Sequence, residues 1–281
     1  MIRQSALAFL LIAAAATSQA AEKSLDKAFT VAPAGELVVD ADGANIRISG
    51  DNSNRVAVKI RARASDEELS RLTFNAVQSG DTVTVTLKDN RKKGGWFNWG
   101  SSHREADIEV TVPASFRVDA HTSGGNVDLT GTHADALLRT SGGDIAARNI
   151  VGKLEARTSG GAITADTVRG EVDANTSGGD VKLLRIDGKI RGRTSGGSIQ
   201  CSLEGANRGI TAITSGGDIE LRLPASATGD IDASTGGGDV TSDLPVTASR
   251  TSETSLAGTL NGGGERIEAR TSGGSIRLRA N

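Results

Sequence analysis

Apolar and polar residues alternate in short segments that return every nine positions through the middle of the chain. Residues 142–150 read GGDIAARNI and residues 151–159 read VGKLEARTS, so each segment has Gly at its second position and Ile or Leu at its fourth. Alternation around the fourth position predicts a short β-strand followed by a turn. A helix is excluded, because the recurring glycines of these segments would each cost roughly 1 kcal/mol relative to Ala.

A four-residue signature, Thr-Ser-Gly-Gly, accompanies this pattern. It stands at residues 122–125, 140–143, 158–161, 176–179, 194–197, 214–217 and 271–274, with a degenerate copy at 235–238. The first five copies are 18 residues apart, which is the length of two nine-residue segments. A fixed period in this range is typical of solenoids. We therefore predict an all-β, parallel β-solenoid, whose coils of about 18 residues consist of two nonapeptide half-coils and stack about 4.8 Å apart.

Glycine marks the corners of these predicted coils. Gly permits the positive φ that a tight corner needs, and the adjacent Thr and Ser can hydrogen-bond to backbone groups there. The glycines to which we assign a structural corner role are Gly124, Gly125, Gly142, Gly143, Gly160, Gly161, Gly178, Gly179, Gly196, Gly197, Gly216, Gly217, Gly273 and Gly274.

Apolar ladders between two sheets form the predicted core. The ladder residues are Ile145, Ile163, Val181 and Ile199 on one sheet and Leu154, Val172 and Ile190 on the other. The small residues expected to face inward beside them are Ala146, Ala156, Ala165, Ala174 and Gly192. The single cysteine, Cys201, is expected in this core as a small, unreactive side chain. No coil buries its apolar face alone, so stability should come from stacking between neighbours.

The N-terminal part of the chain departs from the regular pattern. Residues 1–20 combine Arg3, an apolar run at 6–16 and a Ser-Gln-Ala cleavage site, which predicts a cleaved signal peptide and export to the periplasm, the cell envelope or the exterior. Residues 21–114 predict a strand-rich cap with the first irregular coils, including a degenerate coil at 42–50 and a helical turn at 66–72. Residues 115–281 predict the regular and then loosened solenoid, continuous with the cap as one domain over about 29–281.

The last copies of the signature are irregularly spaced. The interval from Thr235 to Thr271 is 36 residues, twice the period, which predicts one coil that has lost its signature. The chain then ends at residues 275–281, which we predict to be the exposed last strand, with Arg277 and Arg279 discouraging pairing at its edge. This open end is a candidate surface for self-association.

One segment combines aromatic and basic residues. Residues 91–105 read RKKGGWFNWGSSHRE and contain both tryptophans of the chain. The residues expected to contact a partner are Arg91, Lys92, Lys93, Trp96, Phe97, Trp99 and His103. This composition suits a protein interface, a glycan or an anionic membrane surface. The alternative is that the tryptophans fold back and plug the end of the thin core, and the sequence leaves both interpretations open.

Outward positions carry rows of charge beside the signature. Arg139, Arg157 and Arg193 precede it, and Asp144, Asp180 and Asp218 follow it. The two rows flank one corner, where oppositely charged side chains can pair at about 0–1 kcal/mol per exposed pair. We interpret the rows as a solvated surface rather than as a site for an acidic ligand.

Composition and spacing argue against several kinds of chemistry. A net charge of −2 gives no basic surface for nucleic acid. The calcium-binding nonapeptide motif needs Gly at position four and Asp at position six, where this chain has apolar or small residues. His103, His121 and His133 are too scattered for a metal site, and the acidic residues follow the repeat rather than forming a pair for acid–base work. We therefore assign no catalytic, cofactor-binding or metal-binding residue.

The Thr-Ser-Gly-Gly tract resembles the bacterial "putative adhesin" family, a domain of unknown function built of Ser-Gly-Gly-[Asp/Ser]-[Ile/Val] repeats. The opening Phe-Thr-Val at 29–31, the segment DGANIRISG at 42–50 and ADIEVTVP at 106–113 fit the same family. The resemblance covers residues 29–281 and implies a β-solenoid of the cell envelope, with no catalytic residues to carry over. The function that follows is a non-enzymatic binding or structural module with an unknown envelope partner. A scaffold that assembles end to end and a carbohydrate-active enzyme are the alternatives.

Overall fold

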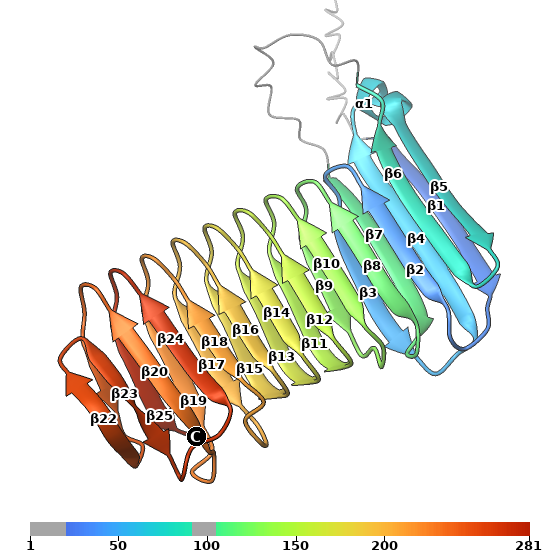
Figure 1. Ribbon diagram of the computed structural model, residues 1–281. Helices are drawn as coiled ribbons and strands as arrows, with labels where there is room; N and C mark the ends of the chain where they lie inside the picture. Colours follow the sequence, from blue (N-terminus) through green and yellow to red (C-terminus); the bar gives the residue numbers. More distant parts are fainter. Residues whose placement is uncertain (1–20, 92–104) are drawn as a thin grey trace, which may run out of the picture.

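Two long β-sheets face each other along a rod (Figure 1). The computed structural model describes residues 21–91 and 105–281. Within these residues, sheet 1 has 12 strands and sheet 2 has 13, and a single short helix accompanies them. The all-β prediction is confirmed. No helix in the described ranges is long and apolar enough to cross a membrane.

The central part of each sheet is a regular parallel stack, in which the chain passes from one sheet to the other at every strand. Sheet 1 contributes β9 (Val127–Thr130), β11 (Ile145–Val151), β13 (Ile163–Arg169), β15 (Val181–Asp187), β17 (Ile199–Leu203) and β19 (Ile219–Leu223). Sheet 2 contributes β8 (Arg117–Thr122), β10 (Ala136–Thr140), β12 (Leu154–Arg157), β14 (Val172–Asn175), β16 (Ile190–Arg193) and β18 (Ile210–Ile213). Residues 18 positions apart lie opposite each other, as Ile145, Ile163 and Val181 do.

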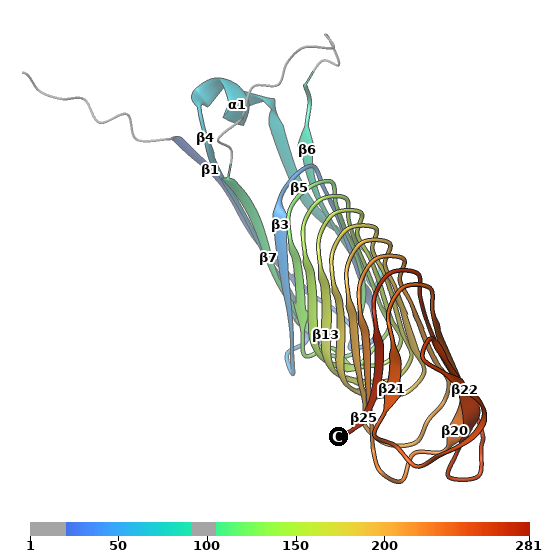
Figure 2. The same ribbon diagram turned by 90° about the vertical axis from the view of Figure 1, so that its left-hand side faces the viewer.

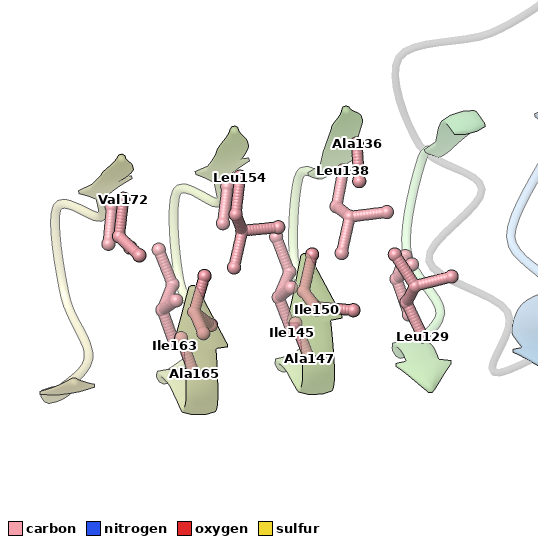
Figure 3. Close-up of a cluster of buried hydrophobic side chains, with 14 of the residues drawn as sticks. Leu129, Ala136, Leu138, Ile145, Ala147, Ile150, Leu154, Ile163, Ala165 and Val172 are labelled. Atoms are coloured by element: carbon pink, nitrogen blue, oxygen red, sulfur yellow. The ribbon is translucent and has the colours of Figure 1, made fainter. Parts of the chain in front are cut away.

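The core is the space between the sheets, and its side chains stack as ladders. Figure 3 shows Ile145 and Ile163 of sheet 1 facing Leu154 and neighbouring residues of sheet 2. All seven predicted ladder residues are at most 1% exposed, and Cys201 is buried beside them. One small residue was misassigned: Ala147, not Ala146, faces inward, because residues alternate between the two faces of a strand and Ile145 already points into the core.

Antiparallel strands flank the stack at its N-terminal end, as Figure 2 shows from the side. β2 (Glu36–Ala41) and β3 (Asn45–Asp51) lie on the regular stack, with β6 (Thr82–Asp89) and β7 (Glu105–Pro113) parallel outside them. β4 (Arg55–Ala64) and β1 (Ala21–Thr30) extend sheet 1 in antiparallel, and β5 (Leu72–Ser79) extends sheet 2. The predicted helical turn is α1 (Asp66–Arg71), held by a capping box between Ser65 and Glu68.

The two edge strands at this end are joined by inward-pointing lysines. Lys23 of β1 donates through Nζ to the backbone carbonyl of Leu72, and Lys27 donates to that of Ala76 at 2.8 Å, both on β5. The two ammonium groups bind carbonyls of β5, the edge strand of sheet 2, and belong to β1, the edge strand of sheet 1. Charged side chains at a sheet edge discourage pairing with another chain.

The C-terminal end differs from the sequence-based prediction in two respects. The strands here are β20 (Gly229–Thr235), β21 (Val240–Ser242), β22 (Val246–Ser252), β23 (Ser255–Leu260), β24 (Arg266–Thr271) and β25 (Ile276–Ala280). The 36-residue interval contains an antiparallel hairpin, β22–β23, and not a parallel coil without a signature. The last strand in sequence is not the last in space, because β25 lies between β19 and β21, and β24 lies between β18 and β20. The period counts positions along the chain and carries no information about the order in which coils stack.

Candidate functional site

The signature threonines form a buried ladder along one corner of the rod. From Thr140 onward, each signature Thr hydroxyl donates to the carbonyl of the second signature glycine in the neighbouring coil, as Thr158 does to Gly143 at 2.9 Å and Thr176 to Gly161 at 2.8 Å. Thr122 donates instead to the carbonyl of Ala44 at 2.8 Å. The same Thr158 hydroxyl accepts from the amide of Gly161 at 3.3 Å. One buried hydroxyl therefore forms a hydrogen bond within its own corner and another to the neighbouring coil. From the sequence, only the hydrogen bond within the corner was expected.

The two glycines of each corner play different roles. A Cβ on the second glycine would lie 2.0–2.2 Å from a backbone carbonyl oxygen of the neighbouring coil. A Cβ on the first glycine would lie 3.1–3.8 Å from its nearest heavy atom. None of the seven pairs, all within the described ranges, has a positive φ. The prediction that these pairs supply positive φ is therefore wrong. The second glycine is required because adjacent coils approach closely there, whereas a Cβ at the first glycine needs at most a shift of a few tenths of an ångström in the neighbouring coil.

Positive φ occurs at another corner of the coil. Asn149, Thr167 and Arg185, each 18 residues from the next, have φ of 56°, 58° and 53°. Gly152 and Gly170 follow at φ 141° and 149°. No sequence pattern indicates a positive φ at the first three positions, because Thr and Arg rarely adopt it.

The charged rows beside the signature do not pair across the corner. Asp144, Asp180 and Asp218 each accept a backbone amide of the next coil, at 2.8, 2.8 and 2.7 Å. The amide of Ser275 and then the Arg277 guanidinium lower the pKa of the Asp218 carboxyl. The acidic row thus links the coils of the stack.

The arginine row binds elsewhere. Arg139 lies 3.9 Å from Asp119, and Arg157 pairs with Glu155 on its own strand. Arg193 forms no ion pair with any described residue. These side chains remain on the solvent-facing side of sheet 2 and form no focused cationic site.

No metal-binding cluster is found among the described residues. No group of three His, Cys, Asp or Glu residues within residues 21–91 and 105–281 could hold a metal ion. Burial raises the pKa of the Cys201 thiol to about 12, so it is not a nucleophile near neutral pH.

The aromatic and basic loop falls almost entirely outside the described residues. Of the residues expected to contact a partner, only Arg91 is described, with its Nε 2.7 Å from Asp89 Oδ2; Lys92, Lys93, Trp96, Phe97, Trp99 and His103 lie outside. The structure does describe where the loop is attached. It leaves at the end of β6 and returns at the start of β7, and we call the surrounding region, with α1 and the start of β1, the N-terminal pole (Figure 1).

Specific contacts hold the attachment points at this pole. The Asn90 amide donates to the Arg71 carbonyl of α1 at 3.1 Å, and Asn90 Nδ2 donates to Thr73 Oγ1 at 2.8 Å. On the returning side, Glu105 is the register partner of Arg63, whose Nε lies 2.9 Å from Glu22 on β1. Both ends of the loop are therefore fixed to one rigid end of the rod.

A row of alternating charge crosses sheet 1 beside the pole. In register order it reads Asp26, Lys59, Glu109, Arg47 and Asp128, on β1, β4, β7, β3 and β9. Arg47 and Glu109 form an ion pair at 3.2 Å, and the row borders a shallow depression that also contains Arg61 and Asp107. Opposite charges on adjacent strands favour this strand order. Sequence reasoning missed the row because its members are far apart in the chain.

Comparison with known proteins places these features in a family. The Toastrack DUF4097 family model matches residues 34–279. Among solved structures, a "putative adhesin" from Bacteroides fragilis is 12% identical, with TM-score 0.46 and coverage of 92% of this chain and 97% of that chain. A "putative lipid binding protein" from Parabacteroides distasonis is 13% identical, with TM-score 0.43 and coverage of 92% and 96%. These similarities are too distant to carry an argument about function. No curated protein matches the sequence.

Proposed function

Since this chain belongs to the Toastrack DUF4097 family, we propose that it is a non-enzymatic binding module of the cell envelope that contacts its partner at the N-terminal pole. The proposal includes export directed by residues 1–20, with Ala21 as the first residue of the mature chain. We further propose that the cap and the solenoid form one continuous domain, whose coils of about 18 residues each consist of two nonapeptide half-coils.

The rod itself offers little to a ligand. Its corner hydroxyls and its Asp row are used in bonds between coils, as Thr176 and Asp180 illustrate. On sheet 2, the row that contains Arg139 and Arg157 runs beside a row that contains Glu155 and Asp173, so charges of opposite sign lie close together. We infer that the regular part serves as a rigid spacer.

The observation that carries the proposal is the attachment of the loop at 91–105. Binding residues are often found on loops that a rigid scaffold positions, and here both attachment points are held by α1 and the antiparallel strands. A loop that contains two tryptophans beside cationic side chains suits the boundary between an apolar and a polar surface. The proposed contact residues are Arg91, Lys92, Lys93, Trp96, Phe97, Trp99 and His103. The partner is an envelope protein, a glycan or a membrane surface.

The alternatives have less support. End-to-end stacking needs open parallel edges, and antiparallel strands flank the stack on both sheets at the N-terminal end and on sheet 2 at the C-terminal end. A carbohydrate-active enzyme needs acidic groups aimed at one substrate, and the acidic row at the corner is engaged with backbone amides.

Co-sedimentation of residues 21–281 with purified envelope fractions tests the proposal. We expect the protein to pellet with one fraction and the Trp96→Ala/Trp99→Ala variant to stay in solution. Val151→Ala, which removes an exposed apolar side chain from the rod, is the matched control and should pellet as the parent does. Equal pelleting of parent and tryptophan variant would refute the loop as the contact. Loss of solubility or of the thermal transition in that variant alone would instead favour the tryptophans as a plug of the core.

A further inference from the structure

The last coil of the chain is inserted between two coils that precede it in sequence. The C-terminal coil, residues 266–281, places β24 between β18 and β20 and β25 between β19 and β21. We call the space that it fills the acceptor slot. The slot exists because the coil that contains Thr235 does not stack directly on the coil that contains Thr214, which precedes it in sequence.

The acceptor slot is built from the same contacts as every other level of the stack. Thr271 Oγ1 donates to the Gly217 carbonyl at 2.8 Å, and Thr235 Oγ1 donates to the Gly274 carbonyl at 2.6 Å. Ile267 lies between Ile210 and Ile231 in register, at the same place in the ladder. The slot therefore selects a coil with a signature corner and an Ile ladder, and every copy of this chain supplies one.

A glycine-rich connection links the C-terminal coil to β23. Asn261, Gly262, Gly263 and Gly264 follow each other with φ of 49°, 91°, 86° and 143°. Glycine rotates with the least steric restriction, so this run can serve as a hinge.

We propose that the C-terminal coil is exchanged between two copies of this chain, so that residues 266–281 of one copy fill the acceptor slot of the other. Without its coil, the slot exposes the Ile210 and Ile231 sides of the ladder to water, and a second copy buries them again. This is domain swapping, in which an identical element satisfies an identical site. The proposal is independent of binding at the N-terminal pole.

A pair of cysteines across the slot detects the exchange. Thr211 of β18 and Glu268 of β24 are register partners on the outer face of sheet 2. Adjacent strands lie about 4.8 Å apart, within the range that a disulfide spans. Thr211→Cys and Glu268→Cys are made in separate chains, one with a tag that changes its mass. The two are refolded together at high concentration in the presence of a reductant, and the folded protein is then oxidised. A covalent heterodimer is expected, and its share should rise with protein concentration.

In the matched control, the second cysteine stands at position 173 instead of position 268. Asp173 lies in the same row of sheet 2 as Thr211 but two strands away, with Arg191 between them. A mixture of Thr211→Cys and Asp173→Cys chains therefore measures random cross-linking between exposed thiols. The native thiol of Cys201 is buried and does not interfere.

Deletion of Gly262 and Gly263 provides a second measurement. A shortened hinge strains insertion within one chain and favours swapping, so light scattering should find a dimer where the parent is a monomer. The proposal would be overturned if the heterodimer were no more abundant than in the control mixture and the variant that lacks Gly262 and Gly263 remained a monomer. An intramolecular disulfide between Thr211→Cys and Asp232→Cys, both introduced into the variant that lacks Gly262 and Gly263, would also overturn the proposal. Those residues are two strands apart when β24 is in place, about 9.6 Å, so they can be joined only if the slot closes on itself.

Discussion

Alanine at the second glycine of a corner should destabilise the protein, while alanine at the first glycine of the same corner should not. Gly161 and Gly160 are neighbours in one corner in the middle of the rod. An added Cβ at Gly161 would lie 2.0 Å from the Gly143 carbonyl oxygen, whereas at Gly160 the nearest atom would be 3.4 Å away. The pair therefore separates the effect of contact between coils from the effect of glycine as a residue type.

The size of the effect follows from these distances. Since Cβ contacts shorter than 3.0 Å essentially do not occur, the Gly161→Ala variant must separate the two corners by about 1 Å. That shift breaks the Thr158–Gly143 bond of 2.9 Å and the Ala162–Asp144 bond of 2.8 Å, which cross the same gap. Two hydrogen bonds at about 1 kcal/mol each, together with about 1–2 kcal/mol of overpacking, give a loss of about 3–4 kcal/mol. Gly160→Ala should raise the free energy of unfolding by about 0.4–1 kcal/mol, because it restricts the unfolded chain.

Urea denaturation of residues 21–281, followed by far-ultraviolet circular dichroism, measures both variants against the parent. The midpoint should fall for Gly161→Ala and stay level or rise for Gly160→Ala. Because a long repeat array can unfold in stages, hydrogen exchange of the amides in β11, β13 and β15 serves as a local measurement. Equal midpoints and equal exchange in the two variants would refute the argument that close approach of coils requires the second glycine.

Three further predictions concern single side chains. Thr132 is buried and its hydroxyl has no hydrogen-bond partner among the described residues, so Thr132→Val should raise the free energy of unfolding by about 1 kcal/mol, measured by the shift of the urea midpoint. Cys201, with its pKa raised to about 12, should react with a thiol reagent only when the stack opens, so at neutral pH its labelling rate should follow the unfolding rate; rapid labelling of the folded protein would contradict its burial. The lowered pKa of Asp218 means that its contribution to stability is present above the usual value of 3.8 and is lost as pH falls below it, so the Tm difference between the parent and Asp218→Asn should shrink in acid.

The regular stack could be predicted from the sequence because its determinants are local. A glycine at position two and an Ile, Leu or Val at position four of each nonapeptide define a strand and a corner, and the fixed period brings equivalent residues together. The different roles of Gly160 and Gly161 were not predictable, because they depend on how closely a coil 18 residues earlier approaches. The φ of 58° at Thr167 was not predictable either, since a β-branched residue is disfavoured there and the surrounding stack imposes it.

The order of the last coils was unpredictable for a different physical reason. Ile231 and Ile267 occupy the same ladder position, and Thr235 and Thr271 make the same kind of corner bond, so either coil could stack on the coil that contains Thr214. Local sequence preference hardly distinguishes the two arrangements. In the observed order, the C-terminal coil has a neighbouring coil on both sides, and the hairpin β22–β23 lies outside β20 on sheet 2.

The two ends of the rod can therefore be tested separately. A solenoid transmits stability mainly between neighbouring coils, so a change at one end has little energetic effect many levels away. Trp96→Ala/Trp99→Ala should abolish retention by an envelope fraction and leave the exchange of residues 266–281 unchanged. Deletion of Gly262 and Gly263 should change the oligomeric state and leave the intrinsic affinity of each N-terminal pole unchanged. If the hinge deletion strengthens retention, the cause would be two poles carried by one dimer, and the gain should vanish when the partner density on the fraction is too low for both to bind at once.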